Sequence, residues 1–156
     1  MAVVPEQEHD LSDNAAALDR AQDRLSQETC RLSAPAPTVG GVDTREAAQR
    51  WAEVWERGWR EHDAAAIAAL YAQGAFWQQH PFHEPEQGYL ARVFAEEESA
   101  ECRFGRPIVD GDQAAVPWTA QTTLTDGGNE DLAGVSLLRF NPSGLVVEER
   151  DFWNQR

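Results

Sequence analysis

The chain has 156 residues, a formal net charge of −14 and no lysine among its 13 basic residues. Its length suits one domain with a tail, and the all-arginine basic set is compatible with a high-GC bacterial source. The acidic balance argues against nucleic acid or an anionic membrane as a partner, because both are bound through basic surfaces. We find neither an export signal nor a run of roughly 20 apolar residues, so a cytoplasmic location is expected.

The first part of the chain is polar and rich in alanine, and it ends in the stretch SAPAPTVGG. Proline and glycine at this density are typical of a linker, so we predict a tail over residues 1–42 and a folded domain over residues 43–156. Within this tail leucine recurs every seven residues, and one apolar position per heptad is half of a coiled-coil seam. The tail is therefore predicted to be partly helical or disordered, with a packing or dimer-supporting helix as the alternative. The recurring residues are Leu11, Leu18, Leu25 and Leu32.

Two helices are predicted at the start of the domain. Asp43 and Glu46 form a capping box, and bulky residues follow at helical spacing on the inner face: Trp51, Val54, Trp55 and Trp59. The segment EHDAAAIAALYAQG predicts a short second helix that Asp63 caps and Gly74 ends. Its apolar face is predicted to hold Ile67, Leu70 and Tyr71.

A strand, a corner and a third helix are predicted next. AFWQQH is typical of a short strand, and the prolines of HPFHEP predict a stiff corner that sets the entry angle of the following helix. QGYLARVFAEEES predicts that helix, with an acidic, exposed end. From about Glu101 onward, apolar segments are separated by DGD, TDGGNED and NPSG, which indicates antiparallel strands. The order predicts an α+β fold with helices packed on one face of an antiparallel sheet.

The order and spacing of these segments resemble one superfamily. A helix ending in LYAQGAFW, then HPFHEP with Gly88 just beyond, a GDQAAVPW strand and a closing GLVVEERDFW strand resemble the nuclear transport factor 2-like proteins. More narrowly they resemble the SnoaL-like branch, the relatives of ketosteroid isomerase and polyketide cyclases. The resemblance covers residues 43–156. It implies a cone-shaped fold of three N-terminal helices packed on a curved antiparallel sheet, with an apolar pocket for a small molecule and a homodimer through the sheet.

His80 is the first candidate for chemistry. Ketosteroid isomerase carries its carboxylate general base just before a proline, in a segment that QHPFHEP resembles, and His80 occupies that position. A neutral imidazole can take a proton α to a carbonyl near neutral pH. The same resemblance puts Trp55 where those enzymes have an oxyanion-donating tyrosine, and an indole N–H is a poorer donor to an enolate. The alternative is a His80 that hydrogen-bonds to the backbone of the corner.

Asp151 is the second candidate. Limonene epoxide hydrolase and some cyclases carry an aspartate on the final strand, in a segment that ERDFW resembles. The hydrolase also needs an arginine and a second aspartate on a neighbouring strand, where this chain offers Trp118 and Ala120, and this argues against epoxide hydrolysis. The alternative is an ion pair of Asp151 with Arg139 or Arg150.

Strand alternation assigns the residues of the final segment to two faces. Glu149, Asp151 and Trp153 are predicted to form the pocket face. The opposite face is predicted to hold Val146, Glu148, Arg150 and Phe152.

We expect His80 and Asp151 to lie across one apolar pocket, as base and acid of a proton-transfer reaction. The walls of this pocket are predicted to be aromatic: Trp55, Trp77, Phe104, Trp118 and Trp153. The alternative for the helical tryptophans is a place in the core.

No metal or cofactor is expected. His80 and His83 have His-x-x-His spacing with Glu84 beside them, but a proline intervenes and a third anchored ligand is missing. Cys30 and Cys102 have no metal or redox spacing, and a disulfide is not expected. We find no glycine pattern of a nucleotide site.

Three functions fit these observations, because the fold alone does not fix activity. The first is a small-molecule-binding domain with an apolar pocket. The second is a cofactor-independent isomerase, cyclase or dehydratase that uses His80 and Asp151. The third is an oligomerising interaction module.

Overall fold

The computed structural model of the protein describes residues 41–156. The leucine repeat, Cys30 and nearly all of the predicted tail lie outside the described residues. The first described element is α2 (Thr44–Glu61), which Asp43 caps by accepting hydrogen bonds from the backbone N–H groups of Arg45 and Glu46. The predicted start of the domain's first helix is therefore confirmed.

The second helix is shorter than predicted. Helix α3 (Ala64–Ala68) begins after Asp63, whose side chain accepts from the Ala66 N–H, and strand β1 (Tyr71–Gln78) follows almost at once. The predicted helix end at Gly74 was wrong, because the chain is already extended at Tyr71. Pairing with the last strand explains the early change: the Val146 N–H donates to the carbonyl of Leu70, next to β1. Gly74, with φ of +75°, lies at an irregularity inside the strand.

The third helix also ends early. Helix α4 (Tyr89–Glu96) gives way directly to β2 (Glu97–Phe104), since Glu97 has extended backbone angles. The acidic run was predicted to be an exposed helix end, and this was wrong for Glu97, whose side chain is buried.

Four further strands complete the sheet: β3 (Ile108–Asp110), β4 (Gln113–Leu124), β5 (Asn129–Phe140) and β6 (Val146–Gln155). The sheet has six strands in the order β1-β6-β5-β4-β2, with β3 paired to β4. Strand β1 runs parallel to β6 and the other pairs are antiparallel. The predicted α+β class with helices and a curved, mainly antiparallel sheet is confirmed; the cone of three N-terminal helices stays a prediction.

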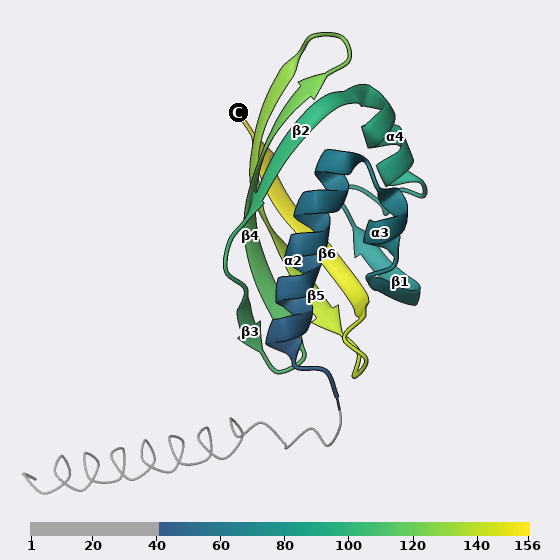
Figure 1. Ribbon diagram of the computed structural model, residues 1–156, viewed down its shortest axis with the longest axis vertical. Helices are drawn as coiled ribbons and strands as arrows, with labels where there is room; N and C mark the ends of the chain where they lie inside the picture. Colours follow the sequence, from purple (N-terminus) through teal and green to yellow (C-terminus); the bar gives the residue numbers. More distant parts are fainter. Residues whose placement is uncertain (1–40) are drawn as a thin grey trace, which may run out of the picture. The chain divides into compact units, whose positions relative to one another are not determined.

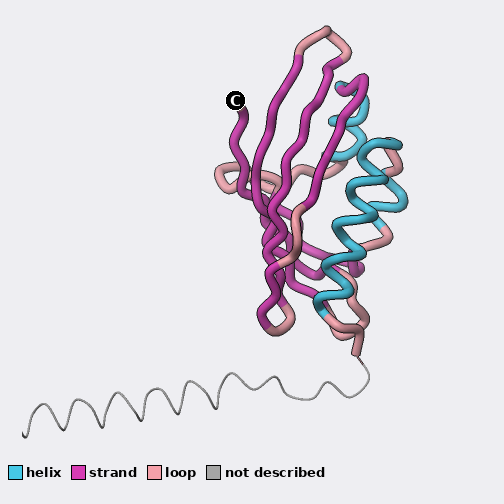
Figure 2. Tube along the Cα trace, turned by 60° about the vertical axis from the view of Figure 1, so that its left-hand side comes forward, coloured by secondary structure: helices cyan, strands magenta, loops and turns pink. Residues whose placement is uncertain are grey.

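The helices lie on one side of the sheet, and the strands curve around α2 (Figure 1 and Figure 2). Side chains of α2, of α3 and of the inner sheet face pack into a core around Trp51, Ile67, Val116 and Val146, each at most 1% exposed. Burial of Val146 contradicts its predicted place on the outer face. A register shift between β5 and β6 at Arg139/Phe140 explains the difference, because one extra residue reverses the alternation.

Gly134, in the middle of the sheet, leaves room for two aromatic side chains. A Cβ on Gly134 of β5 would lie 2.6 Å from the Cβ of Trp153 and 2.9 Å from the Trp118 ring. Only a residue without a side chain leaves room here for both neighbours. Within residues 41–156, none of the helices has the length and apolar character of a membrane span.

Candidate functional site

A cavity of about 550 Å³ lies between the helices and the inner face of the sheet. Its size falls in the range of small-molecule sites, roughly 300 to 1,000 Å³. Side chains from α2, α4 and from strands β1, β2, β4, β5 and β6 border it. The cavity brings together all the residues singled out from the sequence: Trp55, Trp77, His80, Phe104, Trp118, Asp151 and Trp153.

Asp151 is held in place by neutral donors. Its carboxyl accepts hydrogen bonds from the Ser136 hydroxyl and, at 2.8 Å, from the Trp77 indole N–H, and its side chain is 8% exposed. Trp118 in turn donates to the Ser136 hydroxyl at 3.1 Å. Burial raises the pKa of Asp151 to about 6, although these hydrogen bonds favour the ionised form.

Glu149 lies beside Asp151 on the same face of β6 and is 1% exposed. The Tyr71 hydroxyl donates to its carboxyl, and the indole N–H groups of Trp51 and Trp55 donate to the Tyr71 oxygen at 3.4 and 3.1 Å. The carboxyls of Glu149 and Asp151 are also hydrogen-bonding partners. These contacts form a continuous chain from the two tryptophans to Asp151.

The two carboxyls differ in their affinity for a proton. Burial, and next the charge of Asp151, raise the pKa of Glu149 well above its ordinary value. Glu149 therefore keeps its proton to higher pH than an exposed glutamate does, while Asp151 is largely ionised above its pKa of about 6. Tyr71 keeps its proton as well, because burial and the charge of Glu149 raise its pKa. The cavity thus holds an acid and a base in contact.

His80 borders the same cavity without a hydrogen bond to Asp151. Its Nδ1 accepts from the Phe82 N–H at 3.3 Å, and its ring lies 5.1 Å from Trp153, edge to face. The first contact lies within the corner that follows β1, and the second places the imidazole against β6. The backbone contact matches the alternative that the sequence left open for this residue.

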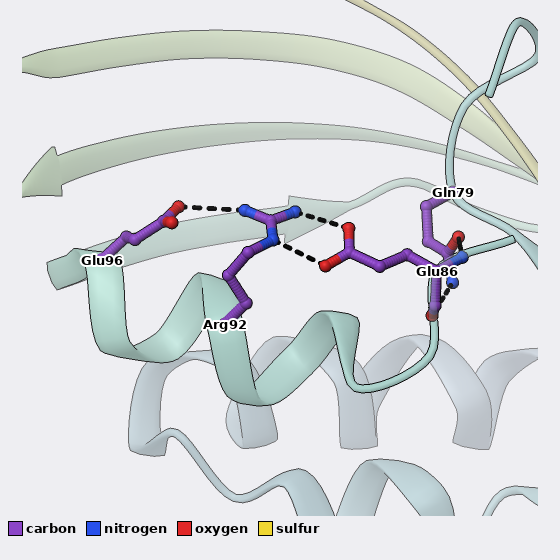
Figure 3. Close-up of polar contacts among 4 residues, drawn as sticks. All are labelled: Gln79, Glu86, Arg92 and Glu96. Carbon is purple, nitrogen blue, oxygen red and sulfur yellow. Dashed lines mark hydrogen bonds and ion pairs between the residues drawn. The ribbon is translucent and has the colours of Figure 1, made fainter. Parts of the chain in front are cut away.

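Gln79 fixes that corner. Its side chain accepts from the Glu86 N–H at 3.0 Å and donates to the Glu86 carbonyl at 3.4 Å, closing the loop between β1 and α4 (Figure 3). The Trp153 indole donates to the Gln79 carbonyl at 2.7 Å. The stretch that carries both histidines is therefore a braced corner whose inner side borders the cavity.

The arginines proposed as partners of Asp151 bind elsewhere. Arg139 and Arg150 both pair with Glu148, at 3.0 and 2.8 Å, on the outer face of the sheet. That alternative for Asp151 is wrong, because residues 148 and 151 lie on opposite faces. Cys102 also borders the cavity, and burial raises its pKa to about 12, so its thiol is not a ready nucleophile.

A third carboxyl borders the cavity at the start of β2. Glu97 is 8% exposed and accepts a hydrogen bond from the Trp59 indole at 2.9 Å. Burial raises its pKa to about 7, and the charges of Glu130 and Glu96 add to the shift. In residues 41–156, no cluster of three or more His, Cys, Asp or Glu side chains is arranged to hold a metal ion.

Sequence reasoning missed four residues of this site. Glu149 was placed on the pocket face by strand alternation but not considered as an acid, and Ser136 carried no signal of its own. Tyr71 followed a helical spacing that concealed its strand position. Glu97 was hidden in an acidic run that resembles a solvated helix end.

A model of the SnoaL-like domain matches residues 48–149 of this sequence. Three solved structures illustrate the similarity of fold. An epoxide hydrolase/cyclase-like enzyme, SalBIII, described in pyran ring formation in the polyether salinomycin, is 20% identical. The aligned region covers 72% of this chain and 93% of SalBIII, with a TM-score of 0.60.

The other two structures are more distant in sequence. An LEH-like epoxide hydrolase of M. tuberculosis is 14% identical, with 72% of this chain and 86% of that chain covered and a TM-score of 0.59. An NTF2-like protein of unknown function from Exiguobacterium is also 14% identical, with 69% and 98% covered and a TM-score of 0.58. At these identities the likeness establishes the fold. Among curated proteins, no sequence matches this chain.

Proposed function

Because this chain belongs to the SnoaL-like domain family, we propose that its cavity binds an apolar small molecule and that Asp151 and Glu149 transfer protons on it. The observation that carries the proposal is the contact between two buried carboxyls of unequal pKa. Enzymes that need an acid and a base at one pH obtain them by placing carboxyls in different surroundings. The resemblance to the nuclear transport factor 2-like superfamily stated from the sequence is confirmed.

In this proposal Asp151 is the base and Glu149 the acid. Asp151, ionised near neutral pH, takes a proton from a substrate O–H or C–H group, and Glu149 gives its proton to an oxygen that gains negative charge. Glu149 takes the place of His80 as the partner of Asp151 in the proton transfer, because the described contacts of His80 are with Phe82 and Trp153 and not with Asp151. His80 then borders the cavity without a part in the proton transfer.

Ring closure of a hydroxy-epoxide illustrates how such a step balances. Asp151 removes the hydroxyl proton as that oxygen bonds to an epoxide carbon, the epoxide C–O bond breaks, and Glu149 protonates the released oxygen. Asp151 is then protonated and Glu149 ionised. Because the two carboxyls are hydrogen-bonding partners, one proton shift between them restores the starting state.

Relatives support this class of reaction. The epoxide hydrolase/cyclase-like enzyme and the LEH-like epoxide hydrolase have the same fold, and both are described as enzymes related to epoxide hydrolases. Water activation by an Asp-Arg-Asp set is not supported for this chain, because Trp118 and Ala120 border the cavity where that set would need charge. We therefore favour cyclisation or isomerisation over hydrolysis.

Filling the cavity tests whether it is the binding site. Ala120 lies on β4, borders the cavity and is 6% exposed, whereas the adjacent Thr119 is exposed on the other face. We expect Ala120→Phe to abolish the rise in melting temperature that apolar hydroxy-epoxides or unsaturated ketones cause in the wild type, and Thr119→Phe to preserve it. At 100 times its Kd a ligand adds about 2.7 kcal/mol, which is several degrees.

Differential scanning fluorimetry of the three proteins measures this effect. An equal shift in Ala120→Phe and in the wild type would mean that the ligands bind outside the cavity.

A second candidate function is assembly through the sheet. The outer sheet surface exposes three large apolar side chains, which supports a homodimer formed by this face. They are Phe76, Leu137 and Phe152, each between 39% and 43% exposed. This assembly and the catalytic proposal are compatible, since the cavity lies on the opposite face of the sheet.

A further inference from the structure

Glu97 is the buried ionisable group that the proton-transfer step leaves without a role. It begins β2, while Asp151 lies on β6 with β5 and β4 between them. Three strand spacings, about 14 Å, separate the two strands across the sheet. The register adds an offset of eight residues along the strands, because Asp151 is level with Val116 of β4 and Glu97 is level with Leu124. The two carboxyls therefore mark different ends of one cavity.

A single neutral donor serves the Glu97 carboxyl. Among residues 41–156, only the Trp59 indole donates a hydrogen bond to it, through Oε2. The charged groups that act on it, Glu130 and Glu96, are both acidic, and the titratable groups on which its own charge acts are the uncharged Tyr89 and Cys102. A carboxylate that is nine-tenths buried needs a charged partner or several donors, and the described residues supply neither.

Aromatic rings build the wall beside this carboxyl. Trp59 stacks on Trp55 with ring centroids 5.4 Å apart, and the Phe94 ring meets Trp59 edge to face at 5.2 Å. Trp55 and Trp59 both border the cavity. Aromatic rings that border a cavity beside a carboxylate form a site that attracts an organic cation.

The charge of the cavity favours the same kind of ligand. Arg92 is the one arginine among its described lining residues, and Glu86 and Glu96 hold its guanidinium at 2.7 and 3.0 Å (Figure 3). An anionic ligand would meet no free guanidinium. The acidic lining residues are Glu84, Glu86, Glu96, Glu97, Asp126, Glu130, Glu149 and Asp151.

We propose that the ligand of this cavity is an apolar molecule with an amine, whose ammonium group contacts Oε1 of Glu97, the carboxyl oxygen that does not accept from Trp59. The proposal rests on the proposed function, because it assigns a substrate class to the same cavity. The ammonium end binds at β2, and the uncharged remainder extends to Asp151. The substrate is thus held by an end remote from the reacting atoms.

Two probes of equal shape distinguish the contribution of charge to the binding affinity from that of apolar contact. One is trimethyl(4-phenylbutyl)ammonium, and the other is its neutral analogue with carbon in place of nitrogen. We expect calorimetry to show the wild type binding the cation roughly tenfold more tightly than the analogue, or better. Glu97→Gln should remove this preference while leaving the affinity for the neutral analogue unchanged. Glu98→Gln, on the exposed side of β2, should preserve it.

The wild type provides a second readout that needs no variant. Since the cation prefers the ionised Glu97, its affinity should fall as the pH drops below about 7, and that of the neutral analogue should not. Equal affinity of the two probes at every pH would overturn the ammonium site and leave the binding cavity standing. If neither probe bound the wild type, the ammonium site would be overturned and the proposed function would lose its apolar ligand.

Discussion

Replacing Asp151 by asparagine should lower turnover by about 10²- to 10⁴-fold, the usual contribution of a general base. The amide has nearly the shape of the carboxylate but cannot take a proton. Ser136 and Trp77 can still contact it, so the side chain keeps its position. The fold should therefore persist, and the loss should fall on the rate of the chemical step.

Initial rates of ring closure or isomerisation, followed by proton NMR with compounds that shift the melting temperature, measure this loss. Glu148→Gln is the matched control, because Glu148 lies on the same strand and faces outward in ion pairs with Arg139 and Arg150. Its turnover should equal that of the wild type. Unchanged turnover in Asp151→Asn would remove this residue from the mechanism.

The free energy of unfolding should fall as the pH rises, because two buried carboxyls, Asp151 and Glu149, have raised pKa values. A carboxyl whose pKa is raised in the folded protein binds its proton more tightly there than in the unfolded chain. Its contribution to the free energy of unfolding is therefore favourable at low pH and lost as the pH rises. For Asp151 the loss spans the range from its ordinary pKa of 3.8 to about 6 and amounts to about 3 kcal/mol. Glu149 acts in the same direction and extends the loss to higher pH.

Urea unfolding between about pH 4 and pH 8 checks this expectation. The free energy of unfolding of the wild type should fall over this range, and Glu149→Gln or Asp151→Asn should reduce the fall. Glu148 provides a control of opposite sign. Hydrogen bonds from Arg150 and Arg139 lower its pKa, so Glu148→Gln should make the fall steeper. A fall that is the same in the wild type, Glu149→Gln and Asp151→Asn would show that Glu149 and Asp151 are ionised like exposed carboxyls.

Local signals were sufficient for much of the fold. Asp43 and Asp63 mark their helix starts through capping, which depends on neighbouring residues only. Turn residues between apolar segments located the antiparallel strands. Tyr71 and Val146 were assigned to the wrong element or face, because pairing of β1 with β6 and the register shift in β6 are long-range features. Short apolar spacings fit a helix and a strand equally well.

The aromatic wall was easier to predict than the chemistry. Large aromatic side chains near strand positions tend to face a cavity or core, so Trp77, Trp118 and Trp153 could be singled out from the sequence. Acid and base roles depend on burial and on distant neighbours. Glu149 becomes an acid only because α2 and Tyr71 cover it, and Glu97 is buried only because the chain becomes extended after α4.

Carbon-13 NMR of the side-chain carboxyls, titrated against pH, tests most directly whether the cavity holds an acid and a base in contact. Assignment comes from the signals that disappear in Asp151→Asn and Glu149→Gln. We expect the Asp151 carboxyl to titrate near pH 6 and Glu149 to be still protonated there. If both carboxyls titrate near pH 4, their ordinary range, both are ionised at neutral pH and the proposed acid does not exist.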